Sequence, residues 1–353
     1  MKRKYRIALC GYYGFGNLGD ELLALALRRA SEREGVSPGE MVVLSATPSE
    51  TYATLGIRAV QRWNAGAVFQ VLRHSETLLL GGGGLFQDST SRRSCLYYWG
   101  LVKLALAAGS LPWCVGQSIG PFRSKICSAL ARSAMGSCSQ RGVRDVRSRA
   151  LLEEWGMQGR LMPDPVFSLA SSMRPGRKVP SPGGGELLVN IRPWKEGLPV
   201  RTASEAARIA GKLGLSITGV ALSEEDGALM AELRDRGEFP CVRVVRLCGG
   251  RWMDEASALF AHASGAVAMR YHFALLSILH GVPLSVAAYD PKVEALASEW
   301  DIPCWKGEES LPEPRGLDAS RAKDRLREMD SAFSTEFSEM WDAVQKRKGR
   351  SAP

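Results

Sequence analysis

The feature that most constrains the fold of this chain is a repeated alternation of short apolar runs with helical patterns. The first series opens with an apolar run at residues 6–10, a glycine-rich loop and a helical pattern at residues 20–33. Later apolar runs lie at residues 41–45, 77–80, 112–116 and 142–143, with helical stretches between them. This alternation is typical of βα units, in which helices cover both faces of a parallel sheet. We therefore expect an α/β fold.

A second series follows a segment that has no apolar periodicity. Residues 173–186 are rich in Pro, Gly, Ser and basic side chains, which indicates a linker. Apolar runs then recur at residues 187–191, 215–220, 242–245, 265–269 and 283–287, with helical patterns at 202–212, 224–236, 254–262 and 273–280. The sequence thus predicts two Rossmann-like domains, 1–172 and 187–317, that face each other across a cleft lined by the carboxyl ends of both sheets.

The last segment, residues 318–353, is predicted to form a long polar helix. Its apolar residues recur at spacings of three and four: Leu326, Met329, Phe333, Phe337, Met340, Trp341 and Val344. These side chains need a surface to cover. The sequence leaves two alternatives open, a helix that crosses back to the first domain and one that packs on its own domain.

Length and charge narrow the class of protein. At roughly 150 residues per domain, 353 residues predict about two domains. A net charge of +9 suits nucleic acid, an anionic membrane surface or a phosphorylated substrate. No long run of basic residues occurs apart from the cluster at the carboxyl terminus, so a nucleic-acid-binding arm is not indicated. The longest apolar stretches fall short of the roughly 20 residues that cross a bilayer, and the amino terminus lacks a signal-peptide run. A cytoplasmic protein is expected.

The cysteine pattern points to free thiols. Eight cysteines are scattered singly through apolar segments, without a C-x-x-C pair and without a histidine at zinc-ligand spacing. Buried cysteines behave as small hydrophobic residues, and reduced thiols fit a reducing compartment. We expect no structural disulfide and no metal site.

A glycine-rich block, GYYGFGNLGDE at residues 11–21, follows the first predicted strand and opens a helix. Its glycines allow a sharp turn and close approach to a ligand, and a helix amino terminus favours an anion. The spacing fits neither a P-loop nor a dinucleotide fingerprint. Gly16, Asn17 and Asp20 are therefore candidate site residues, although capping of the helix is the more common role for an aspartate at this position.

Two further loops at predicted strand ends share this design. Residues 81–88, GGGGLFQD, contribute Gly82, Gly83 and the acidic Asp88, and residues 116–122 contribute Gln117. Each glycine in regular structure is destabilising by roughly 0.5–1 kcal/mol relative to alanine, so four in a row suggest a ligand lying against bare backbone. We expect the three loops to converge on one rim.

Basic side chains gather at other predicted strand ends. Arg270 and His272 follow the strand at residues 265–269, and Lys292 follows the one at residues 283–287. Such a set makes an electropositive pocket for a ligand with phosphate and carboxylate groups. Arg144 also follows a short strand; a structural pair with Asp145 and a ligand contact both remain open. Asp164, in a Pro-Asp-Pro turn, suits a capping role.

Taken together, these motifs resemble the polysaccharide pyruvyl transferase family, and more narrowly its CsaB-like members. The resemblance rests on residues 11–21, 81–88, 116–122, 143–145 with Ser148, 163–167, the R-x-H motif at 270–272 and GVPLSVAAYDPKV at 281–293. It implies a GT-B-like fold, phosphoenolpyruvate as donor and a sugar as acceptor. CsaB-like members would form a 4,6-linked pyruvyl ketal on N-acetylmannosamine of a lipid-linked cell-wall polymer precursor. The resemblance also implies donor binding or activity for Arg144, Arg270, His272 and Lys292.

The residues allow a mechanism without a metal or redox cofactor, with phosphoenolpyruvate as co-substrate. We expect His272 to protonate the methylene carbon, because imidazole titrates near neutral pH, and Asp20 or Asp88 to accept the proton of the sugar hydroxyl. The basic termini and linker could face anionic lipid, which would place the protein at the inner membrane surface. One alternative is a GT-B glycosyltransferase that uses a nucleotide sugar, with Glu294 or Glu299 on the ribose. Another is a non-catalytic anion-binding protein.

Overall fold

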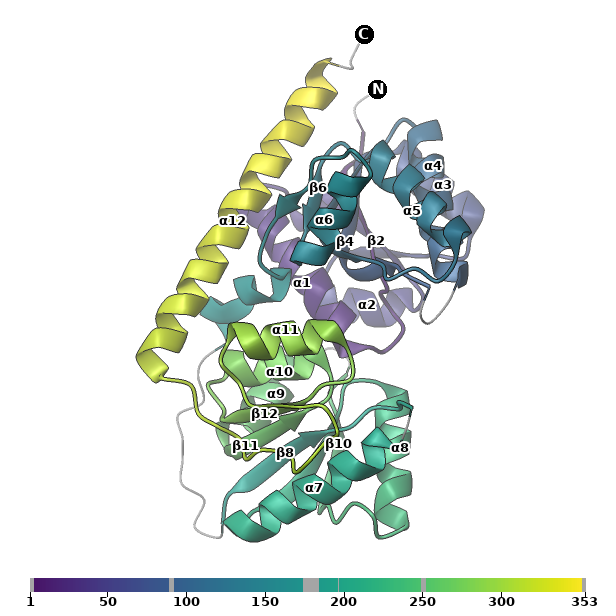
Figure 1. Cartoon of the computed structure of the whole chain (residues 1–353). Coiled ribbons are helices and arrows are strands. Elements are labelled where there is room, and N and C mark those ends of the chain that lie inside the picture. Colours follow the sequence, from purple (N-terminus) through teal and green to yellow (C-terminus); the bar gives the residue numbers. More distant parts are fainter. Residues whose placement is uncertain (1–2, 89–91, 174–183, 196, 249–251, 351–353) are drawn as a thin grey trace. The chain divides into compact units, whose positions relative to one another are not determined.

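A computed structural model of the chain describes residues 3–88, 92–173, 184–195, 197–248 and 252–350, which fall into two compact units (Figure 1). Unit 1 comprises the described residues of Met1–Phe15, Asp20–Leu169 and Glu328–Pro353. Unit 2 comprises those of Gly16–Gly19 and Ala170–Arg327. Most of the expected linker, residues 174–183, lies outside the described residues.

Unit 1 is built on a parallel sheet with the strand order β3-β2-β1-β4-β5-β6-β7. Its strands are β1 (Tyr5–Cys10), β2 (Met41–Ser45), β3 (Arg58–Gln61), β4 (Ser75–Phe86), β5 (Leu111–Ile119), β6 (Arg141–Val143) and β7 (Arg160–Leu161). The helices between them are α1 (Leu18–Arg33), α2 (Pro48–Leu55), α3 (Ala65–Arg73), α4 (Arg92–Ala107), α5 (Lys125–Ser137) and α6 (Val146–Glu154), with short 3-10 segments η1 (Pro38–Glu40) and η2 (Pro165–Ser172).

Both faces of this sheet are covered, as the apolar runs require. On β1, Ala8 and Cys10 join a core with residues of α3, α4 and α5, while Ile7 and Leu9 are buried on the other face. Successive side chains of a strand point to opposite faces, so a strand buried on both sides is apolar throughout. This explains why the run at residues 6–10 shows no alternation.

Unit 2 has its own parallel sheet, with the order β10-β9-β8-β11-β12-β13. Its strands are β8 (Glu186–Asn190), β9 (Ser216–Ala221), β10 (Arg243–Arg246), β11 (Ala263–Ala268), β12 (Leu284–Ala287) and β13 (Cys304–Trp305). Helices α7 (Leu198–Leu213) and α8 (Glu224–Asp235) cover one face, and α9 (Trp252–Ala261), α10 (Tyr271–Leu279) and α11 (Pro291–Glu299) lie on the other (Figure 1). The carboxyl ends of these strands therefore meet at one edge.

The last helix, α12 (Ala319–Arg350), contributes its residues from Glu328 onward to unit 1. There the Trp113 ring of β5 lies 5.5 Å from the Phe337 ring and 5.7 Å from the Trp341 ring, centroid to centroid. Arg160 of β7 adds ion pairs to two glutamates of α12, at 3.0 and 2.6 Å. The apolar spacing of this segment thus serves an aromatic contact with the first sheet.

The predicted class, α/β with two parallel sheets and a long carboxyl-terminal helix, is confirmed, but one local expectation is wrong. β4 continues through all four glycines, residues 81–84, instead of ending before them. Among the described residues no helix is both long enough and apolar enough to span a membrane. All eight cysteines are free, and six of them are buried.

Candidate functional site

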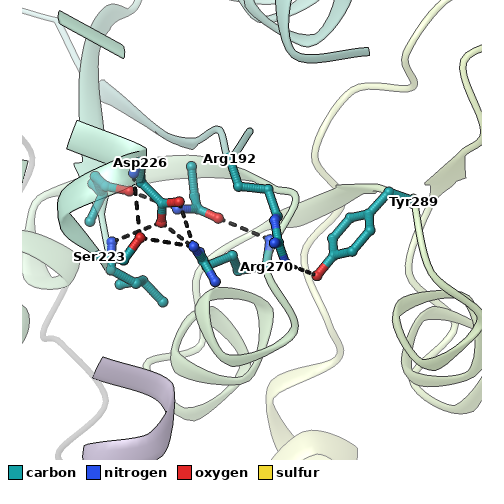
Figure 2. A network of polar contacts seen from close by, with 8 residues as sticks. Arg192, Ser223, Asp226, Arg270 and Tyr289 are labelled. Atoms are coloured by element: carbon teal, nitrogen blue, oxygen red, sulfur yellow. Dashed lines mark hydrogen bonds and ion pairs between the residues drawn. The ribbon is translucent and has the colours of Figure 1, made fainter. Parts of the chain in front are cut away.

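The carboxyl edge of the second sheet carries a polar network around Arg270, the residue that precedes α10 (Figure 2). Its Nε and Nη2 atoms each lie 2.6 Å from an oxygen of Asp226, and Nη2 also donates to Ser223 Oγ at 2.8 Å. The backbone N–H of Arg270 donates to Asn190 Oδ1 at 2.9 Å. The bidentate pair joins the segments that follow β9 and β11, and the hydrogen bond to Asn190 adds the end of β8.

Asp226, the partner of Arg270, is completely buried. It was not among the predicted site residues. It lies in the first turn of α8, where its partner Ser223 caps the helix by accepting the N–H of Asp226. An acidic residue in the first turn of a helix is so common that the sequence offers no sign of a partner on another strand. Its charge compensates that of Arg270, so Arg270 is held in one orientation.

His272 lies on the first turn of α10 and is half-buried. Its ring packs so closely on Gly19 that a Cβ atom at position 19 would lie 2.2 Å from Nδ1. The neighbouring Leu18 N–H donates to the carbonyl of Leu222, just after β9, at 2.8 Å. The structure thus brings residues 16–19, with the predicted Gly16 and Asn17, to the same edge of unit 2 as His272.

Lys292 belongs to the same edge, since β12 neighbours β11 in the sheet. Asp290 caps α11 by accepting the Lys292 N–H at 2.9 Å, and the Lys292 Nζ lies 3.5 Å from the other oxygen of Asp290. The lysine side chain is 42% exposed, so the ion pair is weak and its ammonium group remains accessible. A phosphate group could compete for it.

Arg144 lies in unit 1 and pairs with Asp164, not with Asp145 as one reading of the sequence had it. Both side chains of the pair are buried, and Arg144 Nε also donates to Ser118 Oγ at 2.8 Å. Asp145 instead caps α6, accepting the N–H of Ser148 at 2.8 Å. A buried arginine in an ion pair with its hydrogen bonds made has a structural role that a ligand is not needed to explain.

The central glycines of β4 pack against the protein itself. A Cβ at Gly82 would lie 2.7 Å from Leu23 of α1, and one at Gly81 would lie 2.4 Å from Leu27 and from the Tyr13 hydroxyl. Gln117 is fully buried beside them, and its Nε2 donates to the Leu80 carbonyl at 3.2 Å. Close packing against α1 therefore explains Gly81 and Gly82 without a ligand.

The two candidate bases differ sharply. Asp88 is buried and accepts the backbone N–H groups of Arg123 and Ser124, both at 2.7 Å. Burial alone would raise its pKa, but these hydrogen bonds outweigh it, so the pKa of Asp88 is lowered. Asp88 thus anchors the segment before α5 and is a poor proton acceptor. Asp20 lies beside Gly83, where a Cβ would be 3.3 Å from Oδ1.

Glu21, next to Asp20, is a titratable group that the sequence analysis did not single out. Its Oε1 accepts the Gly14 N–H at 2.7 Å, and its Oε2 is buried with no hydrogen-bond partner in the described part of the chain. Burial raises its pKa to about 7, opposed by the Gly14 hydrogen bond and helped by the charges of Asp20 and Glu50. The glycine-rich loop therefore rests on a carboxyl group that titrates near neutral pH.

The two glutamates that a nucleotide-sugar glycosyltransferase would use to bind the ribose form ion pairs within the chain. Glu294 accepts the Lys306 ammonium at 2.6 Å, and Glu299 pairs with Arg325 at 3.3 Å. The described residues contain no group of three or more His, Cys, Asp or Glu side chains placed to hold a metal ion.

Comparison with known families decides the class of protein. The family model for polysaccharide pyruvyl transferase matches residues 17–291, well over half of the chain. The chain belongs to the polysaccharide pyruvyl transferase family. It is therefore a transferase of polysaccharide biosynthesis, and membership implies a sugar acceptor and a small-molecule donor. No curated protein sequence shows significant similarity to it.

Solved structures share the fold of this chain at low sequence identity. An α,α-trehalose 6-phosphate synthase from Burkholderia multivorans is 11% identical, with a TM-score of 0.55 over 99% of this chain and 100% of that one. A putative UDP-N-acetylglucosamine 2-epimerase from Listeria monocytogenes is 10% identical, with a TM-score of 0.55 over 97% and 91%. The S. aureus MnaA–UDP co-structure is 10% identical, with a TM-score of 0.54 over 92% of this chain and 95% of that one. These likenesses confirm a GT-B-like fold.

Proposed function

We propose that this chain is a CsaB-like enzyme that moves the pyruvyl group of phosphoenolpyruvate onto a sugar. The acceptor is N-acetylmannosamine of a lipid-linked cell-wall polymer precursor, and the product is a 4,6-ketal. The observation that carries the proposal is the cluster at the carboxyl edge of the second sheet, where Arg270, His272 and Lys292 follow neighbouring strands. Cationic and proton-donating groups at one sheet edge suit a small donor with two anionic groups.

The cluster supports a division of roles on the donor side. His272 is the general acid that protonates the methylene carbon of phosphoenolpyruvate, and Gly19 keeps its ring in place. Lys292, with its exposed ammonium, neutralises the departing phosphate. Arg270 holds the strand ends rigid through Asp226, so that the backbone preceding His272 is fixed.

The bonds made and broken balance without an additional reactant. The proton from His272 converts the methylene group to a methyl group, and the central carbon becomes electrophilic. A first sugar hydroxyl attacks this carbon and gives its proton to Asp20. A second hydroxyl of the same sugar then displaces phosphate and gives its proton to the deprotonated His272 ring, which closes the ketal and restores the acid. The proton on Asp20 leaves with the phosphate. Asp20 is the proposed base because Asp88 is occupied by two backbone N–H groups.

The test is an assay with phosphoenolpyruvate and a synthetic lipid-linked ManNAc-GlcNAc disaccharide. We expect phosphate release and a pyruvylated acceptor in the mass spectrum, both lost in the His272→Gln variant although phosphoenolpyruvate still binds. His74→Gln is the matched control, since His74 lies in unit 1 at the C-terminal end of α3, where its half-buried ring contacts the Gln70 carbonyl. Release of a nucleotide from a panel of UDP-sugars, without phosphate release from phosphoenolpyruvate, would overturn the proposal.

A further inference from the structure

Arg192, which was not among the predicted site residues, lies at the carboxyl edge of the second sheet and contacts two aromatic rings. The guanidinium carbon of Arg192 is 5.5 Å from the centroid of the Trp194 ring and 4.7 Å from that of the Tyr289 ring. Its Nη1 donates to the Tyr289 hydroxyl at 2.7 Å (Figure 2). The centroids of the Trp194 and Tyr289 rings are 4.6 Å apart. Cation–π contacts and one neutral hydrogen bond orient this guanidinium.

The charge of Arg192 is not compensated by a carboxylate of the described chain. Arg144 pairs with Asp164, and Arg270 pairs with Asp226. For Arg192, by contrast, Nε is buried with no hydrogen-bond partner within the described ranges, and Nη2 makes no hydrogen bond to them either. A buried donor without a partner costs about 1–3 kcal/mol, so such a group calls for an explanation.

The strand order places this charge at the end of β11, the strand that leads into Arg270 and His272. Arg192 comes two residues after the end of β8, and Tyr289 comes two residues after the end of β12. β11 lies between these strands in the sheet and leads into Arg270 and His272. The hydrogen bond from Arg192 to Tyr289 therefore passes over the end of β11, at the entrance of α10.

We propose that Arg192 binds an oxyanion of the donor, through the Nε and Nη2 edge of its guanidinium. This inference rests on the proposed function and names a residue that it lacks. One edge of a guanidinium matches two oxygens of a carboxylate or a phosphate, and both groups occur in phosphoenolpyruvate. Both atoms lack a hydrogen-bond partner within the described ranges, so the oxyanion would supply the acceptors that they lack. Trp194 and Tyr289 fix the orientation of the guanidinium group without neutralising its charge.

The experiment compares the affinity of the full-length enzyme for phosphoenolpyruvate in Arg192→Met, Arg192→Lys and the wild type, by calorimetry. Loss of two charged hydrogen bonds predicts affinity weaker by roughly 10- to 100-fold for Arg192→Met, only partly restored by lysine, which lacks the fork. The KM for phosphoenolpyruvate rises, whereas the KM for the acceptor stays the same. Tyr289→Phe, which removes only the orienting hydroxyl, weakens binding by a few-fold. Arg234→Met, on the exposed face of α8, is the matched control and binds as the wild type does.

Further probes identify the oxyanion and separate the possible failures. Inorganic phosphate and pyruvate are titrated separately, and the one whose affinity falls in Arg192→Met is the group bound; if neither falls, the inference is overturned. Unchanged phosphoenolpyruvate affinity in a folded Arg192→Met or Arg192→Lys variant also overturns it, and the proposed function then stands if the wild type still releases phosphate. If the wild type neither binds phosphoenolpyruvate nor releases phosphate, both are overturned.

Discussion

Glu21→Gln should make unit 1 more stable at neutral and alkaline pH, because it removes a carboxylate that burial disfavours. Burial raises the pKa of Glu21 from 4.5 to about 7. The folded state therefore binds more protons than the unfolded state between these two values, and the free energy of unfolding falls as the pH rises from about 4.5 to about 7. A difference of about 2.5 pKa units corresponds to about 3 kcal/mol, present in full above pH 7.

The variant keeps the hydrogen bond that holds the loop, since a glutamine oxygen can accept the Gly14 N–H in place of Glu21 Oε1. Its amide group adds a buried donor where Oε2 already has no partner in the described chain, which costs about 1 kcal/mol. The net gain at pH 8 is therefore about 2 kcal/mol, and near pH 4 the wild type is equal or slightly more stable.

The assay is urea unfolding between pH 4 and 8, with hydrogen exchange used to assign a transition to peptides of β1 and α1. This assignment matters because a chain of two units need not unfold in one step. Glu153→Gln, on the exposed part of α6, is the matched control and should change stability by less than about 0.5 kcal/mol. A Glu21→Gln variant with the same pH dependence as the wild type would refute the reasoning.

Two further substitutions test the contacts around the site. Gly19→Ala places a Cβ 2.2 Å from His272 Nδ1, so we expect turnover to fall at least about tenfold at saturating phosphoenolpyruvate; Gly39→Ala, with open space around its Cβ, is the control. Normal turnover in Gly19→Ala would show that the ring position is unimportant. Arg144→Met leaves Asp164 buried without its cation and should destabilise unit 1 by about 3–5 kcal/mol in urea unfolding, whereas Arg144→Met with Asp164→Asn should recover part of this loss. An unchanged midpoint in the single variant contradicts the structural role of the pair.

The elements of regular structure were predictable because their signals are local. The apolar runs that predicted β1 and β8 differ from the observed strands by one residue, and α12 begins one residue after the predicted start at residue 318. Short edge strands such as β3 and β7 were not predicted, because they are half-exposed and have no apolar run. Their pairing depends on neighbouring strands, which no single window of sequence contains.

The glycine-rich segments show where a local pattern has two physical causes. Glycine permits close approach of any group, and a ligand and a helix are equally good reasons for it. At Gly82 the group is Leu23 of α1, whereas at Gly19 it is the ring of His272. The sequence placed both glycines at strand ends but could not say what approaches them, because the approaching side chain comes from another element.

The three arginines at strand ends differ in the same way, and their partners decide what each can do. Arg144 meets its carboxylate 20 residues away, Arg270 meets Asp226 at a separation of 44, and Arg192 meets Tyr289 at 97. A ligand can bind a paired guanidinium only by sharing it with the internal carboxylate or by displacing that carboxylate. The contacts of the ligand must then offset the loss of the internal ion pair. An aromatic ring orients the guanidinium group but does not neutralise its charge. The paired arginines therefore fix the strand ends, and the arginine among rings is the one from which an anionic substrate gains most.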